Sequence, residues 1–179
     1  MSEDTTQPIA RLWSPDGFRD DGWTHAGSAE ALSGNSRIIL PLDAFLTLDA
    51  ETRSASADRI GVHVAPGQEL GPLLFHLPTL PLVSLGFPAF NDGRSYSKAV
   101  LLRHRHGYRG AIRASGDVLI DQIPLMLRSG FTEFEVTNET ALRRLERGVP
   151  GWIGNHYQPA VQQERAGAGF SWRRAGGAA

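Results

Sequence analysis

Two short stretches of the chain carry side chains suited to holding a small anion. The first, FPAFNDGRSYS, contains Asp92, Gly93, Arg94 and Ser95. The second, IRASGDVLIDQ, contains Arg113, Gly116 and Asp117. Guanidinium groups beside glycine N–H donors at the start of a helix suit phosphate, sulfate, sulfite or a carboxylate. The two stretches therefore predict an anion site. The alternative is that Arg94 pairs with Asp92 and Arg113 with Asp117, and that both pairs only brace their loops.

His63 is the one histidine expected to carry a proton, because it lies near the end of the β-branched run 59–64, on the side where ligands bind. A hydrogen-bonded structural role is the alternative for this side chain. His104 and His106 are two residues apart on an expected helix, so their side chains diverge and cannot chelate one metal ion. No metal and no cofactor is expected. The chain has no cysteine and lacks the glycine-rich signatures of dinucleotide and phosphate-binding loops.

Length and composition favour a single globular domain. The 179 residues are 41% hydrophobic and 21% charged, which is close to the globular average. A net charge of -1 argues against a dedicated nucleic-acid binder, although residues 94–113 hold several basic side chains and no acid. No apolar run reaches the roughly 18 residues that cross a membrane, and the N-terminus does not resemble a signal peptide. We therefore expect a soluble, cytoplasmic protein.

Strand-like and helix-like segments alternate along the middle of the chain. Strands are expected near 37–42, 59–64, 82–87, 111–114 and 131–136. Helices are expected at 44–48, 69–77, 95–106, 117–128 and 139–147, with Asp43, Ser95, Asp117 and Asn138 at the start of four of them. Pro124 predicts a kink in the fourth helix, and Gly130 its end.

This alternation predicts an α/β fold built of repeated βα units, with a mostly parallel sheet of about five strands. Both a three-layer and a half-barrel-like arrangement are compatible with it. Residues 1–35 are interpreted as an irregular lead-in, 36–160 as the α/β domain and 161–179 as a flexible tail. A half barrel leaves sheet edges open, which predicts a homodimer.

The two anion-binding stretches both follow expected strands. In parallel α/β folds, ligands bind beyond the carboxyl ends of the strands. Consecutive right-handed βα units bring neighbouring strand ends side by side. Arg94 and Arg113 are therefore expected to face the same crevice.

The block from Phe87 to Val136 resembles a bacterial domain-of-unknown-function family usually labelled "oxidoreductase probably involved in sulfite reduction". Motifs of the form F-x-DGR-x-YS-x-A-x-LLR, GY-x-G-x-x-RA-x-GDVL-x-DQ and GF-x-x-FE stand at 90–103, 107–122 and 130–135. A weaker likeness extends to 59–64 and 156–160. Ala111 departs from the family pattern, where an acidic residue is common, and so does Pro124.

The resemblance implies a role beside sulfite reductase in assimilatory sulfate reduction. Without cysteines or a nucleotide fingerprint, the chain has no evident redox group of its own. The expected function is an accessory protein that binds a small oxyanion or the reductase. One alternative is a half-barrel-like enzyme acting on a phosphorylated or carboxylated small molecule. Another is a non-catalytic interaction module whose basic helix docks an acidic partner.

Overall fold

The computed structural model describes residues 10–89 and 92–148. The strands are β1 (Arg11–Ser14), β2 (Gly17–Arg19), β3 (Trp23–His25), β4 (Arg37–Pro41), β5 (Ile60–Val64), β6 (Leu82–Phe87), β7 (Ala111–Gly116) and β8 (Glu133–Val136). They form one sheet in the order β2-β1-β8-β7-β6-β5-β4-β3. Strands β3 to β8 are parallel neighbours in chain order, and β1 pairs with β8 in the antiparallel sense.

Helical segments fill the connections between the parallel strands. The α-helices are α1 (Leu42–Thr47), α2 (Ala50–Ala55), α3 (Arg94–Val100), α4 (Ile123–Ser129) and α5 (Glu139–Glu146). Shorter or irregular helices are η1 (Ala29–Ser33), η2 (Ala57–Arg59), η3 (Gly71–Thr79) and η4 (Leu101–Arg105), the last continuing α3. The α/β class is confirmed, and the predicted parallel sheet is matched in outline, although β1 pairs with β2 and with β8 in the antiparallel sense. The sheet has eight strands rather than about five.

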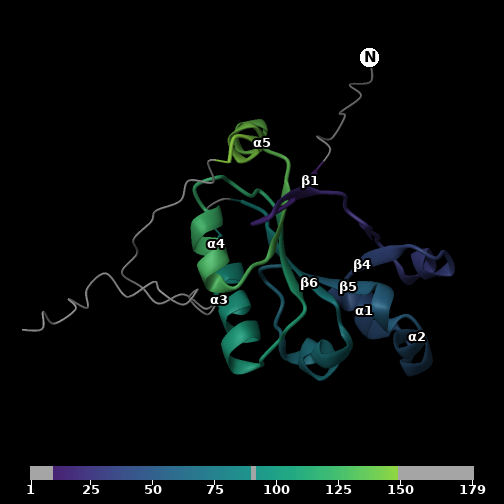
Figure 1. Cartoon of the computed structure of the whole chain (residues 1–179). Coiled ribbons are helices and arrows are strands. Elements are labelled where there is room, and N and C mark those ends of the chain that lie inside the picture. Colours follow the sequence, from purple (N-terminus) through teal and green to yellow (C-terminus); the bar gives the residue numbers. More distant parts are fainter. Residues whose placement is uncertain (1–9, 90–91, 149–179) are drawn as a thin grey trace, which may run out of the picture.

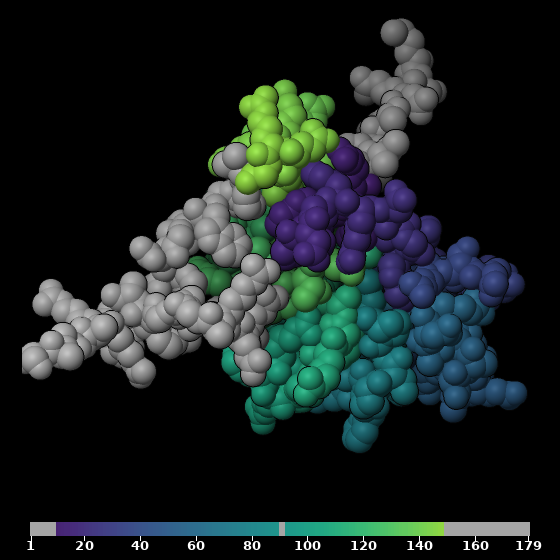
Figure 2. Space-filling model, in the orientation of Figure 1, coloured from purple at the N-terminus to yellow at the C-terminus, as the bar shows by residue number. Residues whose placement is uncertain are grey.

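The sheet curls into a half barrel (Figure 1). Its two edge strands, β2 and β3, lie at opposite ends of the strand order, yet only residues 20–22 connect them. Because a chain spans at most about 3.6 Å per residue, so short a link forces the two edges close together. The β1–β2 hairpin also packs beside α5, as Figure 2 shows in purple and yellow-green, where Arg11 forms an ion pair with Glu146.

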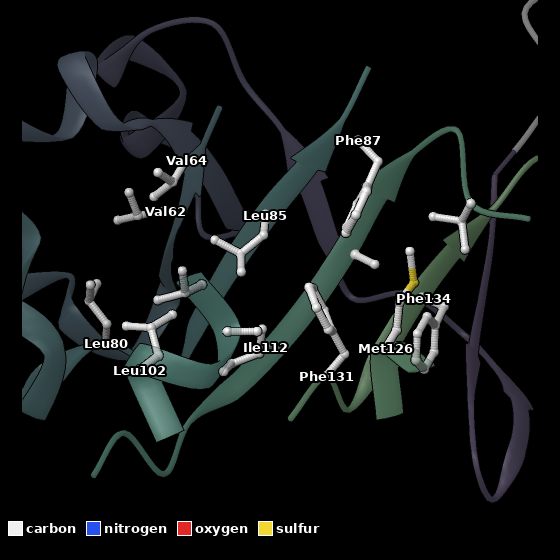
Figure 3. Close-up of a cluster of buried hydrophobic side chains, with 14 of the residues drawn as sticks. Val62, Val64, Leu80, Leu85, Phe87, Leu102, Ile112, Met126, Phe131 and Phe134 are labelled. Atoms are coloured by element: carbon white, nitrogen blue, oxygen red, sulfur yellow. The ribbon is translucent and has the colours of Figure 1, made fainter. Parts of the chain in front are cut away.

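The apolar core lies between the sheet and its helices. Val62 and Val64 of β5, Leu85 of β6 and Ile112 of β7 all point to one face of the sheet (Figure 3). Leu102 and Met126, from η4 and α4, close over that face. Burying an aliphatic or aromatic side chain of this size contributes roughly 1.5–3 kcal/mol to folding. Alternate residues of the same strands point to the opposite face.

The N-terminal stretch differs most from expectation, because three strands occupy residues 11–25 where an irregular lead-in was expected. These strands are three or four residues long, too short to show a periodic pattern. Pairing with β8 and β4, which are distant in sequence, holds them in place. The expected tail at 161–179 lies outside the described residues.

Several helix starts also differ from expectation. Ser95 is not an N-cap: it lies within α3, buried, and its hydroxyl donates to the Gly86 carbonyl at 2.6 Å. Asp43 caps no helix, because α1 already begins at Leu42, directly after β4. The helix expected from Asp117 begins only at Ile123.

Pro124 therefore stands in the first turn of α4, where its missing N–H breaks no helical hydrogen bond, and the expected kink does not arise. One predicted helix end and one predicted helix start are confirmed. Gly130 ends α4 with a φ of 106°, and the Asn138 side chain caps α5 by accepting from the Ala141 N–H at 3.0 Å. Within the described residues, no helix is both long and apolar enough to span a membrane.

Candidate functional site

Polar side chains gather on the sheet face that lies opposite the helices, here called the inner face. They are His25, His63, Ser84, Arg113, Ser115, Glu133 and Glu135. His63, Ser84, Arg113 and Glu133 are register partners on the neighbouring strands β5 to β8. Side chains on one row of a sheet project to the same side. This row is therefore a polar band inside the curl. Buried Ile39 and Leu82, which are in register with His25 and Gly61, lie beside it on the same face.

His25 and Glu135 join the two sides of this surface. The imidazole Nε2 of His25 lies 2.9 Å from Oε1 of Glu135 and 3.1 Å from Oε2. These residues stand on β3 and β8, which have four strands between them in the sheet order. Contact across that span is possible only because the sheet is curled, and it shows that the inner face is the concave one.

Arg113 is the fully buried centre of an ionic network. Its Nη1 donates to Asp21 at 2.8 Å and to Glu135 at 3.1 Å, while Nε and Nη2 donate to Glu133 at 3.0 and 2.9 Å. Arg19 forms a second ion pair with Glu133. Burial by itself lowers the pKa of Arg113. The carboxylates of Asp21 and Glu133 raise that pKa by more than burial lowers it, so the guanidinium stays charged. The network holds two guanidinium groups and three carboxylates.

Glu135 receives bonds from both His25 and Arg113. Burial by itself raises the pKa of Glu135, but the hydrogen bonds and charges of its two partners outweigh this and lower the pKa below the usual 4.5. The carboxylate is therefore ionised at neutral pH. It orients the His25 ring and leaves that ring partly exposed at the edge of the inner face.

His63 lies beside the ionic network and forms no ion pair with any residue in the described part of the chain. Its Nδ1 lies 3.2 Å from the Ser84 hydroxyl and 3.5 Å from that of Ser115, and the two hydroxyls are 2.9 Å apart. The His25 ring stands edge-on to it, with the ring centroids 5.8 Å apart. Burial, and then the nearby His25, lowers the pKa of His63 below 6.5. His63 is therefore a neutral imidazole at pH 7.

Gly86 makes room for the His63 ring. A Cβ at position 86 would lie 3.0 Å from Cε1 of His63 and 3.1 Å from Nε2, closer than ordinary contact. The imidazole thus lies directly against the backbone of β6. Its position is defined by packing as well as by the Ser84 hydroxyl.

The inner-face groups most able to exchange protons stand at the carboxyl ends of their strands. His25 is the last residue of β3, and His63, Ser115 and Glu135 are each one residue before the end of β5, β7 and β8. This is the side of a parallel sheet at which ligands bind in α/β folds. The position predicted for a ligand from the alternating pattern is thus occupied by two imidazoles, a hydroxyl and a carboxylate.

The first of the two predicted anion-binding stretches forms a surface ion pair. Arg94 donates from Nε to Asp92 at 3.0 Å and from Nη2 at 2.6 Å, and its side chain is 63% exposed. The Arg94 hydrogen bond is the main cause that lowers the pKa of Asp92 to about 2. Gly93 precedes α3 with a φ of −83°. This is the structural pairing that the sequence offered as an alternative for Arg94.

The second stretch is divided between the inner face and a turn. Arg113 pairs with Asp21, Glu133 and Glu135 and not with Asp117. Gly116 has a φ of 99°, and the Asp117 N–H donates to the Phe87 carbonyl at 2.7 Å. No hydrogen bond or carboxylate is shared by Arg94 and Arg113 among the described residues. Whether an anion binds at these turns stays a prediction.

Sequence reasoning missed the residues that surround Arg113. Glu133 and Glu135 carry a readable signal, since FTEFEV alternates charged with apolar residues in a run otherwise buried. Asp21 and His25 carry none. They belong to the N-terminal stretch, whose place in the sheet depends on pairing with distant strands.

Residues 61–167 match a family described as "Bacterial protein of unknown function (DUF934)". The chain belongs to this family. No curated protein matches it. The matched region spans β5 to β8 and so includes His63, Arg113 and Glu135, whereas Asp21 and His25 lie before it. Among the described residues, no three histidine or acidic side chains are grouped so as to hold a metal ion.

Proposed function

We propose that this DUF934 protein is an accessory protein of assimilatory sulfite reduction that binds a small oxyanion, together with a proton, on its inner face. The observation that carries the proposal is the convergence of His25, His63 and Ser115 at the carboxyl ends of three strands. A hydroxyl can donate a hydrogen bond to an anion, and an imidazole with one nitrogen already facing Glu135 or Ser84 can donate from its other nitrogen when the ring is protonated. The sulfur setting is supported by the motif likeness of residues 87–136.

The charge of the inner face explains why a proton accompanies the anion. Three carboxylates outnumber the two guanidinium groups, so an added anion meets no surplus of positive charge. Protonation of His63 would supply the positive charge that an added anion needs. Because the pKa of His63 is lowered by burial in the free protein, the bound anion must raise that pKa and draw a proton from solution. Binding is therefore expected to tighten as the pH falls.

Arg113 has a positioning role in this proposal. All its guanidinium nitrogens already donate to carboxylates, so a bound anion would have to displace one of them. Instead, Arg113 holds Glu135, and Glu135 holds His25. The arginine thus acts on the ligand through two intermediate side chains.

A second candidate function is catalysis on a phosphorylated or carboxylated small molecule. The observation that favours it is the state of His63, whose neutral ring contacts two serine hydroxyls and is suited to accept a proton. The two functions use the same residues. They differ in that an enzyme converts its ligand, whereas an accessory protein returns it unchanged.

Calorimetric titration of sulfite, sulfate and phosphate into the full chain tests the proposal. We expect binding that weakens about ten- to a hundredfold in His63→Ala and His25→Ala, on the scale of one charged hydrogen bond. Arg94→Ala is the matched control and should bind as the unmodified protein does. Loss of binding in Arg94→Ala alone would place the site at the surface turn instead. No binding of any of the three anions would contradict the proposal.

Co-purification with sulfite reductase tests the proposed pathway separately from the ligand. We expect the reductase to be retained by the tagged full chain when the two are produced together. Recovery of the ligand chemically changed after incubation, judged by mass spectrometry, would favour the enzyme over the accessory protein. Anion binding without any contact with the reductase would leave the site correct and the pathway wrong.

A further inference from the structure

Phe75 is a large apolar side chain that stands in solvent, with 92% of its surface exposed. It belongs to η3, which connects β5 to β6. The neighbouring residues Leu73 and Leu77 are buried, and the His76 ring packs edge-on against Phe45 at 5.2 Å. The helix is thus anchored on both sides of Phe75. Phe75 is therefore exposed because its buried neighbours hold the helix in an orientation that points this side chain into solvent.

A groove of about 320 Å³ lies along the same helix. One wall is apolar and comes from η3, with Leu74, Leu77 and Pro78. The other wall is the turn that follows η4, with His106, Tyr108 and Arg109. Figure 1 shows the coil between β5 and β6 beside the lower end of the helix that begins with α3.

Hydrogen bonds fix the turn that forms the second wall and tie it to Leu80, the residue that follows η3. The Tyr108 hydroxyl donates to the Leu80 carbonyl at 3.1 Å. Arg103 donates from Nη1 to the carbonyls of Tyr108 and Gly110, at 2.6 and 2.8 Å. A groove preformed in this way loses little conformational freedom when a partner binds.

The charge around the groove selects its occupant. Arg109 and His106 line it, and no acidic residue of the described ranges 10–89 and 92–148 does. In the sequence, residues 94–113 contain no Asp or Glu. We propose that Phe75 and this groove form a docking surface for an acidic segment of a partner protein that carries a large apolar residue. That residue would pack between Leu74 and Pro78, and its acidic neighbours would face Arg109. A second copy of this chain would bring like charges together.

This surface is independent of the proposed anion site. The groove lies beside the residues that lead into β6 and β7, at the amino ends of the strands. His25 and His63 stand at the carboxyl ends. Both surfaces can be occupied at once, so a bound partner leaves the inner face free.

Selection of random twelve-residue peptides displayed on phage against the full chain tests the proposal. We expect the enriched peptides to combine Asp or Glu with a large apolar residue. Synthetic copies should bind at least about tenfold more weakly to Phe75→Ser and to Arg109→Glu, as is usual for a central anchor residue. Leu125→Ser and Arg143→Glu, which alter exposed residues on other helices, are the matched controls and should keep full binding.

Three results would overturn the proposal. Enrichment of basic or uncharged peptides would show that the charge argument is wrong. Failure to enrich any peptide, or binding unaffected by Phe75→Ser, would show that the groove is not a docking surface. If the unmodified protein sediments as a dimer and Phe75→Ser sediments as a monomer, a second copy of the chain is the occupant. Unchanged melting temperatures for both variants ensure that the comparison is made between folded proteins.

Discussion

His25 and Glu135 are in contact, with 2.9 Å between Nε2 and Oε1, although four strands separate them in the sheet. The contact closes the inner side of the half barrel and places an ionised carboxylate against an imidazole. Arg113 donates a hydrogen bond from Nη1 to the same carboxylate. The geometry of the proposed site and the curl of the sheet therefore depend on the same side chains.

Replacing Glu135 by Gln should change how stability depends on pH. The pKa of Glu135 is lowered in the folded protein, so its ionised form stabilises the fold above the usual 4.5 and that contribution is lost as the pH falls through the folded value. We expect Glu135→Gln to be less stable at pH 7 by about 1–3 kcal/mol, with the difference disappearing in acid.

Urea unfolding at a series of pH values measures this effect. His25→Ala removes one of the two groups that lower the Glu135 pKa, and so should give an intermediate slope of unfolding free energy against pH. Parallel curves for the unmodified protein and Glu135→Gln would show that the carboxylate is not held by its partners.

Replacing Arg113 by Met should destabilise the protein strongly. The change leaves three carboxylates without their shared buried partner, which costs about 3–5 kcal/mol. Arg113→Lys should recover only part of the loss, because the ammonium cannot reproduce the guanidinium fork. Arg94→Ala, in an ion pair that is open to solvent, should leave stability nearly unchanged. Equal urea midpoints for Arg113→Met and Arg94→Ala would contradict this account.

Gly116 is required by the turn that follows β7. Its φ is 99°, and an added Cβ would lie 2.3 Å from the Phe87 carbonyl oxygen. Gly116→Ala should therefore lower the unfolding free energy by more than the about 1–2 kcal/mol that the left-handed conformation alone costs. Gly93→Ala is the control, because a Cβ there meets nothing within 4 Å. Thermal unfolding of the two variants makes the comparison, and similar melting temperatures would refute the prediction.

The chain is still predicted to form a homodimer, because β2 and β3 are edge strands of the sheet. Within the described residues, each edge strand pairs with a strand on one side only, so a second chain could pair with its other side. Light scattering at high protein concentration should give twice the mass of one chain. A strict monomer would show that the short connection at 20–22 already protects both edges.

The parallel part of the fold was predictable because each βα unit carries its own local signal. The runs 60–64 and 82–87 are mostly apolar and mostly buried, and a proline follows each run within two residues. Helix starts were less predictable. Ser95 has the residue type of a cap, but its hydroxyl is drawn to the Gly86 carbonyl by the packing of α3 on β6, a contact that no local pattern reveals.

The candidate site was only partly predictable for the same reason. His63 was found because it lies near the end of a recognisable strand, on the side where ligands bind. Arg113 was found as a cation, but its partners were misassigned to the nearest acid in sequence. Glu133 lies on the neighbouring strand, and Asp21 is brought in by the curl of the sheet. Ionic partners across a curled sheet follow from its topology and not from spacing along the chain.

The titration of His63 followed by histidine NMR, with and without sulfite, tests the central claim most directly. In the free protein, the His63 ring should titrate below 6.5 because burial and His25 oppose its charge. Saturating sulfite should move that midpoint upward, since an anion bound at the ring stabilises the imidazolium. The NMR signals of His104, which lies in η4 away from the inner face, should not respond to sulfite. A His63 midpoint that is the same with and without sulfite would contradict proton-coupled anion binding on the inner face.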